Sequence, residues 1–487
     1  MLSWLLACSD YTIEETTKDP PFDPGDSADD DTDEGAPDID VSPVSYDAGD
    51  VEVGALVSTR LTVSNLGDAP LEIDGATTPW TTTFASVTLA PYESTLLEVS
   101  TSALVGLHED SVSIASDDPD EPLVVVPLAY RGLDPCSWEQ WKPDDGCDGG
   151  WPGTGVDGEV TLASWSPNAT TLAAPASGAT LDVADENGFA VDDEVFLHDP
   201  VAGAWAFARV VGVVPLTLAD AVDFPAGTVV QRVPHYTNVR VDETVSGARV
   251  VFRACGTVTV EGRLGADGGG WAGGQRTTTI PELGWQGRSE AGGGAQSDAA
   301  NGTGGGGGSE SCNVHTDGGG GGHATDGTQG GDNLPFSCGG TGGLGGGTIG
   351  EPTLAALFFG GGGGGGYLDT DATAGSYGGA GGGGGGLVRI VALGFDGGGF
   401  VGADGASGED GHWIGGASPG GGGGGAGGSV WLTGPVAVRL SADGAGGGVG
   451  SEAGSGPTNG GTGGEGRIRV DGTLSATTSP EAYEACP

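Results

Sequence analysis

Glycine is concentrated in the second half of this chain. The 487 residues include 103 Gly, and all but 20 of them lie from Gly256 onward. Several Gly runs are uninterrupted, and the longest extends from Gly360 to Gly366. Ordering Gly costs more chain entropy than ordering any other residue. Such runs therefore form a fixed structure only if close backbone packing offsets that cost.

Apolar segments alternate with the Gly runs. Residues 387–391, 429–432 and 467–470 are rich in Val, Ile and Leu, and each segment follows a run. A flexible linker would contain Gly and Ser without an apolar pattern, so a linker is not predicted. The spacing is about 40 residues, which is typical of stacked supersecondary units. We predict a repeat module over residues 257–487, built as a β-solenoid or a sandwich.

The Gly runs require a conformation in which backbones pack directly on one another. We expect extended helices with threefold symmetry that lie side by side and bond through their own N–H and C=O groups. Only Gly allows so close an approach, as at the collagen axis, but collagen itself is excluded because Gly does not recur at every third residue. The strand–Gly alternation is similar to that of glycine-rich extracellular receptor domains and phage tip adhesins, which implies such a bundle.

Negative charge dominates the sequence. Asp and Glu number 67 against 16 Lys and Arg, giving a formal net charge of −51. Such a chain repels phosphate, so no nucleic-acid partner is expected. Thirteen acidic residues and one cation, Lys18, lie between Asp10 and Asp40, with almost no large apolar side chains. We predict a disordered acidic tether over residues 9–39.

The N-terminus resembles a lipoprotein export signal. Leu5-Leu6-Ala7-Cys8 is similar to the bacterial lipobox, in which a small residue precedes a lipidated Cys. The resemblance implies that residues 1–8 are the signal and lipobox, and that Cys8 anchors the chain to its membrane partner. Each buried CH₂ would contribute about 0.8 kcal/mol. With Ser9 next to Cys8, resemblance to enteric sorting rules favours the outer membrane or cell surface of a Gram-negative bacterium. The alternative is a chance Cys in an apolar N-terminus.

The cysteine count fits export. Without Cys8, six remain, which allows three disulfides in 15 connectivities. Their spacing suggests the pairs Cys136–Cys147, Cys312–Cys338 and, by remainder, Cys255–Cys486. Six free thiols or metal ligands are the alternatives, although no CxxC pair is present and zinc is therefore disfavoured.

Residues 40–132 have the pattern of an antiparallel sandwich. Short segments of period two, such as 60–64, 95–99 and 111–114, are separated by turn-forming clusters. The motifs Asn65-Leu66-Gly67 and Ser116-Asp117-Asp118-Pro119 resemble those of the hydin-type, or choice-of-anchor D, Ig-like module. The resemblance implies a spacer or interaction domain of exported proteins, without catalysis.

Residues 133–256 are predicted to form a connector and a second small β region. Several Trp residues surround Cys136 and Cys147, either as a sugar-stacking platform or, as we favour, as a small core beside a disulfide. Short β-type segments follow, including 206–213 and 228–230. The overall fold class is thus mostly β, with an Ig-like sandwich, this second β region and the Gly-rich repeat module.

Three Ala-Asp-Gly turns contain the candidate metal ligands Asp267, Asp404 and Asp443. Calcium prefers several oxygen ligands at close quarters, and a divalent cation would ease the negative charge. The favoured alternative is that each Asp caps its own turn. A metal site at His315 and His323 is also conceivable, but exposed loop histidines are favoured there.

The sequence predicts no catalytic residue. HExxH and GxxxxGK[ST] are missing from the sequence, and GxGxxG strings are expected by chance at this Gly content. We favour a non-catalytic surface lipoprotein with a structural or adhesive role, whose ligand is a polysaccharide or a protein. The alternative is a polysaccharide-active or carbohydrate-binding β-solenoid, which would use paired carboxylates if it were an enzyme.

Overall fold

A computed structural model describes residues 35–485 except 53–55, 83, 105, 134–150, 280–281, 310–315, 333–340, 370–371, 416–417 and 451–457. Those residues form strands, turns and loops, with no helix among them, which confirms the mostly-β fold class. No described segment is a helix that could span a membrane. The chain divides into two compact units, Met1–Leu133 and Asp134–Pro487.

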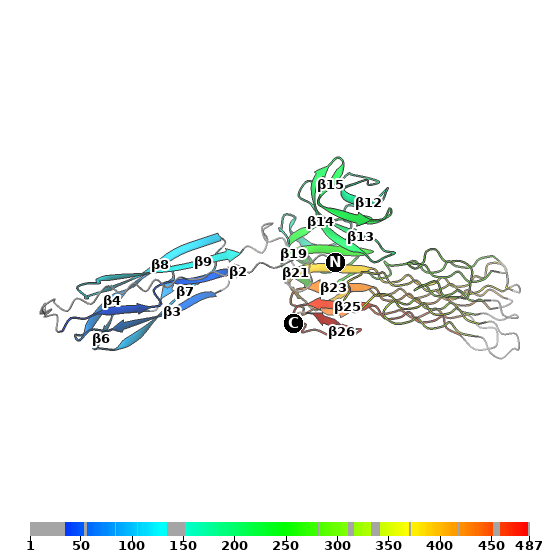
Figure 1. The fold of residues 1–487 in the computed structure, drawn as a ribbon. Coiled ribbons are helices and arrows are strands. Elements are labelled where there is room, and N and C mark those ends of the chain that lie inside the picture. The colour runs from blue at the N-terminus through cyan, green and yellow to red at the C-terminus, as the bar shows by residue number, and fades with distance from the viewer. Residues whose placement is uncertain are drawn as a thin grey trace, which may run out of the picture. The chain divides into compact units, whose positions relative to one another are not determined.

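The first unit is a sandwich of two sheets (Figure 1). One sheet has the order β1 (Ile39–Ser42), β3 (Leu56–Asn65), β7 (Ser94–Ser102) and β5 (Thr81–Thr82). The other has the order β2 (Tyr46–Glu52), β9 (Leu123–Leu133), β8 (Gly106–Ser116), β4 (Leu71–Thr77) and β6 (Val87–Leu89). Alternate residues point inward, so that Leu61, Leu97 and Ile114 are fully buried in one core. The predicted Ig-like sandwich is confirmed.

Two motif residues hold the turns of this sandwich. The side-chain amide of Asn65 donates to the carbonyl of Ala69 at 2.7 Å, and its Oδ1 accepts from the N–H of Gly67 at 3.0 Å. Oδ2 of Asp118 accepts from the N–H of Ile39 at 2.8 Å. Burial would raise the pKa of Asp118, but bonds from three backbone N–H groups outweigh burial and lower it. The sequence motifs are therefore buried turn-forming groups.

The second unit contains two parallel sheets that wind together as a β-solenoid. The larger has the order β10 (Gly158–Thr161), β17 (His235–Val241), β19 (Arg249–Val260), β21 (Leu387–Asp396), β23 (Ser429–Thr433), β25 (Arg467–Asp471) and β27 (Tyr483–Ala485). The smaller has the order β18 (Thr244–Ser246), β20 (Arg263–Gly265), β22 (Phe400–Gly402), β24 (Arg439–Ser441) and β26 (Thr478–Ser479). From β17 to β26 each coil gives one strand to each sheet, whereas β10 and β27 have no counterpart in the smaller sheet. The division expected between residues 256 and 257 falls inside β19.

Stacked apolar residues fill the solenoid. In adjacent strands Phe252 pairs with Ile390, Ile390 with Leu432, and Leu432 with Val470. All four are buried in one core. Because neighbouring strands lie about 4.8 Å apart, each such row is a continuous apolar contact from coil to coil. The period seen in the sequence is the length of one coil together with the Gly-rich segment that leads to the next coil.

A small barrel is inserted between β10 and β17. Its strand order is β11 (Ala169–Thr171), β16 (Val229–Val233), β13 (Glu194–His198), β14 (Trp205–Val213), β15 (Leu216–Phe224) and β12 (Ala176–Leu181). A bridge between Leu172 and Val183 joins its first and last strands. Val195, Leu197 and Val210 are among the side chains that fill its interior, as is usual for a barrel of this size.

The Gly runs extend from the ends of the solenoid strands as long, nearly straight segments that lie side by side (Figure 1). In the run 360–366, every third N–H donates to the same neighbouring segment. Those of Gly360, Gly363 and Gly366 reach the carbonyls of Gly385, Gly382 and Gly379 at 2.8–2.9 Å. Those of Gly361 and Gly364 reach Gly322 and Gly319, and those of Gly362 and Gly365 reach Arg288 and Trp285. Three bonding directions in three residues define a threefold helix.

The bundle has no room for side chains at these positions. A Cβ atom added to Gly363 would lie 2.2 Å from the carbonyl oxygen of Gly423, and one added to Gly364 would lie 1.9 Å from that of Gly306. Both distances are well below van der Waals contact. The hypothesis of packed, hydrogen-bonded polyglycine helices is therefore confirmed for the described runs.

Candidate functional site

The three aspartates predicted as metal ligands lie on successive coils of the solenoid. Oδ1 of Asp267 accepts from the backbone N–H of Asp404 at 2.8 Å, and Oδ1 of Asp404 accepts from the N–H of Asp443 at 2.8 Å. Oδ1 of Asp443 accepts from the hydroxyl of Ser479 at 2.7 Å. Each carboxylate thus bonds to the next coil, whereas the sequence predicted that it would cap its own turn. Stacking in register brings the next coil's N–H within reach.

Together Asp267, Asp404 and Asp443 form a row that we call the Asp ladder. A single arginine pairs with its first two members. Nη2 of Arg263 donates to Oδ1 of Asp267 at 2.9 Å and also bonds Asp404. The hydrogen bonds that Arg263 donates to Asp267, together with the charges of both aspartates, raise the pKa of Arg263 despite its partial burial. Among the described residues, no cluster of three or more His, Cys, Asp or Glu side chains is arranged to hold a metal ion. Calcium at the ladder would have to compete with Arg263.

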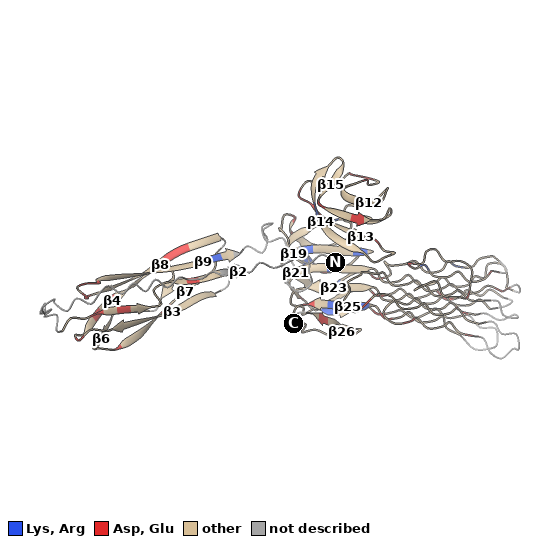
Figure 2. Cartoon of the chain, in the orientation of Figure 1, with Lys and Arg blue, Asp and Glu red and all other residues tan. Residues whose placement is uncertain are grey.

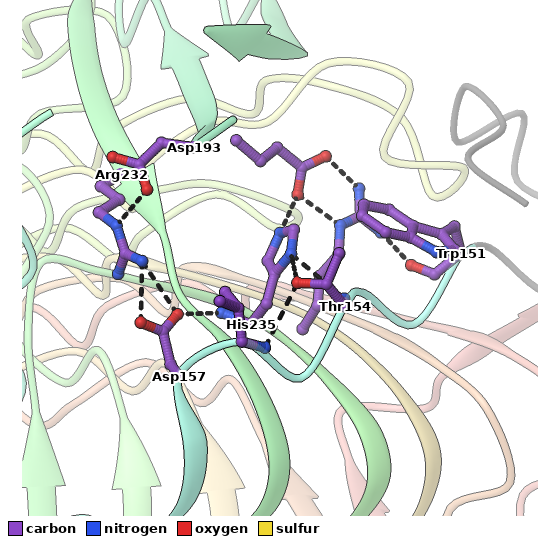
Figure 3. A network of polar contacts seen from close by, with 9 residues as sticks. Trp151, Thr154, Asp157, Asp193, Arg232 and His235 are labelled. Carbon is purple, nitrogen blue, oxygen red and sulfur yellow. Dashed lines mark hydrogen bonds and ion pairs between the residues drawn. The ribbon is translucent and has the colours of Figure 1, made fainter. Parts of the chain in front are cut away.

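A buried charge network joins the barrel to the solenoid (Figure 3). Glu194 of β13 forms an ion pair with Arg253 of β19 at 2.6 Å, and its Oε2 lies 2.9 Å from Nε2 of His235 on β17. All three side chains are at most 3% exposed. Burial alone would raise the pKa of Glu194, but Arg253 and His235 lower it to about 2. Nη1 of Arg253 also donates to the carbonyl of Trp151 at 2.6 Å.

A second arginine lies beside this network between two carboxylates. Nε of Arg232 donates to Asp193 at 2.8 Å, and Nη2 donates to Asp157 at 2.8 Å, as Figure 3 shows. Asp157 also accepts from the backbone N–H of His235 at 2.7 Å. The network therefore fixes how β13, β16 and β17 meet. The hydrogen-bonded pairs around Arg232 and Asp157 are 39 to 78 residues apart in the chain, so no local sequence pattern predicts them.

Few residues of the chain are basic, and several lie on the seven-stranded sheet (Figure 2). Trp431 lies between two of them, because Arg389 and Arg469 occupy the paired positions on the neighbouring strands. Their guanidinium carbons lie 4.2 and 4.1 Å from the Trp431 ring centroid. Burial lowers the pKa of Arg389 to about 9. Arg389 and Trp431 are buried, and Arg469 also forms an ion pair with Asp471 at 2.7 Å.

Two histidines are buried and neutral. Arg249 donates to Nδ1 of His198 at 3.1 Å, and Nε2 of His198 lies 2.8 Å from the carbonyl of Leu357. Burial and then Arg249 lower the pKa of His198 to about 3. His323, expected to be an exposed loop residue, is 1% exposed, and burial lowers its pKa to about 4. That expectation was wrong because the loop turns back into the polyglycine bundle.

The structure describes Cys255 but not the other six cysteines. Cys255 of β19 is disulfide-bonded. Cys8, Cys136, Cys147, Cys312, Cys338 and Cys486 lie outside the described residues, as do His315, Trp138 and Trp141. Of the remaining Trp residues near the first Cys pair, Trp151 is buried edge-on against His235, with ring centroids 5.0 Å apart. Trp151 also lies under the guanidinium of Arg253, at 5.4 Å from its ring centroid, and the disulfide expected beside this Trp lies outside the described residues.

The carboxylates of the buried network and of the Asp ladder are all paired or hydrogen-bonded. An acid–base pair needs one carboxyl whose proton is free to reach a substrate. Asp157 and Asp193 instead share Arg232, Glu194 is enclosed with Arg253, and the Asp ladder is bonded to backbone N–H groups. Chemically, these groups hold strands in register.

Fold and site together define a multidomain β protein, in which a sandwich is followed by a solenoid with a polyglycine bundle. Residues 37–127 match the family of HYDIN/CFA65/VesB-like Ig-like domains. This match supports the hydin-type resemblance for the first unit and covers a minority of the chain. No curated protein matches the chain.

Three solved structures are similar to about a fifth of the chain. A protein of unknown function from Porphyromonas gingivalis is 22% identical over 20% of this chain and 48% of that one, with a TM-score of 0.19. The PapD-like domain 7 of human CEP192 is 10% identical over 23% of this chain and 98% of that one, with a TM-score of 0.19. The Vibrio cholerae VesB protease is 18% identical over 20% and 32%, with a TM-score of 0.17.

Proposed function

We propose that this chain is an exported, lipid-anchored surface protein with a structural or adhesive role and no catalytic activity. The polyglycine bundle carries the proposal. Its backbones bond directly to one another in three directions, so its order rests on main-chain hydrogen bonds. Such a bundle is a stiff support whose connecting loops can vary without disturbing the bonded segments.

Export is supported by cysteine chemistry. Disulfides persist in oxidising compartments, and Cys255 is disulfide-bonded. The lipobox-like Leu5-Leu6-Ala7-Cys8 and the acidic tether after it are consistent with an anchored chain. The Ig-like unit would serve as a spacer between the anchor and the solenoid. An outer-membrane or cell-surface location is part of the proposal.

The alternative is a polysaccharide-active solenoid. The aspartates of the Asp ladder bond to neighbouring coils, and this arrangement favours a structural role over acid–base catalysis. Incubation of the full chain with a polysaccharide panel, followed by product analysis, separates the two. New reducing ends that require the folded protein would establish the alternative.

Lipid labelling tests the anchoring directly. The full chain with its own N-terminus is expressed in a Gram-negative host with labelled palmitate, beside a Cys8→Ser variant. We expect label in the wild type, none in the variant, and protease-accessible protein on intact cells for the wild type. An unlabelled wild type, or wild-type protein found only in the cytoplasm, would overturn the proposal.

A further inference from the structure

A hollow lies where the barrel meets the solenoid. It is lined by Leu162, Ser164, Trp165, Ser166, Pro167, Asn168, Arg232, Pro234 and Tyr236 and has a volume of about 300 Å³. The first six line the connection from β10 to β11, and Arg232 and Tyr236 belong to β16 and β17. This volume is at the lower end of the range for small-ligand sites, about 300–1,000 Å³.

Two aromatic rings in the lining are held in place by contacts with the solenoid core. Trp165 and Tyr236 both pack against Phe252, with ring centroids 5.7 and 5.8 Å away. The indole N–H of Trp165 donates to the carbonyl of Arg249 at 2.5 Å. Both rings are half-buried. A site with fixed rings requires little ordering when a ligand binds, and ordering is a main cost of association.

Polar groups complete the lining. Ser164, Ser166 and Asn168 are exposed. Arg232 is held by Asp157 and Asp193 through Nε and Nη2, and its planar group presents further N–H donors on Nη1. Hydroxyl, amide and guanidinium groups beside aromatic rings match a ligand that has both hydroxyl groups and an apolar C–H face.

The local charge restricts the ligand further. Arg232 carries one positive charge, and the two carboxylates that hold it carry two negative charges. Their sum is negative, in a chain whose net charge is −51. An anionic ligand would be repelled as it approached. The site therefore favours an uncharged ligand over one that carries carboxylate, sulfate or phosphate groups.

We propose that this hollow binds one or two residues of a neutral saccharide. The pyranose C–H face lies against Trp165 or Tyr236, and the sugar hydroxyls bond to Arg232, Ser166 and Tyr236. No bond is made or broken. The proposal rests on the adhesive role proposed above and specifies its ligand class, since a surface protein of this kind would use the hollow to hold a glycan.

The test begins with the full chain on an array of neutral, acidic and amino-bearing glycans. Binding to neutral glycans is expected, and the best soluble oligosaccharide is then titrated by calorimetry. A Ser166→Trp variant fills the hollow from an exposed position and should raise Kd at least tenfold. A Ser177→Trp variant, exposed on β12 away from the hollow, is the matched control and should bind as the wild type does.

A conservative variant locates the contact more finely. Tyr236→Phe keeps the ring on Phe252 and removes the hydroxyl, so Kd should rise about fivefold, as expected for one lost hydrogen bond. Unchanged thermal unfolding shows that each variant is folded. Binding to no neutral glycan, equal binding to acidic glycans, or wild-type affinity in Ser166→Trp would overturn the proposal. None of these results bears on lipid labelling, so failure of the glycan site and failure of the anchoring proposal are distinguishable.

Discussion

The backbone N–H of Asp404 donates to Oδ1 of Asp267 at 2.8 Å, although 137 residues separate the two in the chain. The same relationship joins Asp443 to Asp404 at 2.8 Å. The aspartates thus form a ladder along one edge of the solenoid, with Arg263 bonded to its first two members. Calcium is not needed to explain why Asp recurs at these positions.

Removal of one rung should weaken the solenoid. Asp404→Ala deletes the acceptor for Asp443 and an ionic partner of Arg263, so the free energy of unfolding should fall by about 2–4 kcal/mol. Asp396→Ala, at an exposed residue that ends β21, should change it by less than about 0.5 kcal/mol. Urea unfolding at neutral pH measures both. A melting temperature that drops when calcium is chelated would contradict the structural role and support the metal prediction.

Two adjacent glycines provide a matched test of the polyglycine packing. A Cβ added to Gly447 would lie 2.2 Å from the carbonyl oxygen of Gly460, whereas one added to Gly446 would have no atom within 4 Å. Gly447→Ala should therefore destabilise the protein by about 3 kcal/mol. Gly446→Ala should be close to neutral. Equal melting temperatures for the two variants would show that the run is not packed.

Loss of the buried ion pair between Glu194 and Arg253 should lower the free energy of unfolding strongly. Glu194→Gln leaves Arg253 buried without a counter-charge and should cost about 3–5 kcal/mol. Asp192→Asn removes the partner of Arg209 from an exposed pair and should cost less than about 1 kcal/mol. Since the pKa of Glu194 is lowered from 4.5 to about 2, its stabilising contribution is present above pH 4.5 and is lost as pH falls toward 2. A variant whose deficit persisted unchanged at pH 2 would contradict this.

Asp317 should produce the opposite pH dependence. This residue is buried in the bundle, and burial raises its pKa from 3.8 to about 6, against bonds from Thr458 and the N–H of Gly421. A raised carboxyl pKa means that its contribution is fully present below about pH 4 and is lost as pH rises through 6. Asp317→Asn should therefore be more stable than the wild type by about 3 kcal/mol at pH 7, with the difference closing by pH 4.

Two further measurements make the Asp317 prediction specific. The pKa values of His198 and His323 are lowered, so their protonation destabilises the folded protein as pH falls below 6.5. Because this loss is common to the variant and the wild type, only the difference in stability between them is informative. Asp326→Asn is the control, because Asp326 is exposed and lies only nine residues after Asp317 in the chain. A difference between Asp317→Asn and the wild type that does not change between pH 4 and pH 7 would contradict the assignment.

The parts of the fold that depend on local pattern could be predicted from the sequence. Period-two segments and the Asn65 and Asp118 motifs indicated the sandwich. The alternation of strands with Gly runs indicated a repeat module, either a solenoid or a sandwich, with polyglycine helices. The entropy of ordering Gly leaves close backbone packing as the way in which such runs become fixed. These inferences needed no knowledge of distant contacts.

Relationships set by the stacking of coils could not be predicted. The pair formed by Glu194 and Arg253 spans 59 residues and exists only because the barrel is inserted against the solenoid. The division expected at residue 256 followed composition, but β19 continues through it, with an irregularity between Ala254 and Thr257 in its pairing with β21. The aspartates were predicted at turns, but only Asp267 lies in one, and each of the three accepts a hydrogen bond from the next coil. Composition and residue spacing do not show which positions of neighbouring coils are paired.

Hydrogen exchange across the run 360–366 tests the central claim most directly. Every N–H of this run donates to a carbonyl of a neighbouring segment at 2.7–3.1 Å. Peptide-resolved exchange should therefore show protection of these glycines comparable to that of β21. Complete exchange of the run within seconds at neutral pH, while β21 stays protected, would contradict an ordered polyglycine bundle.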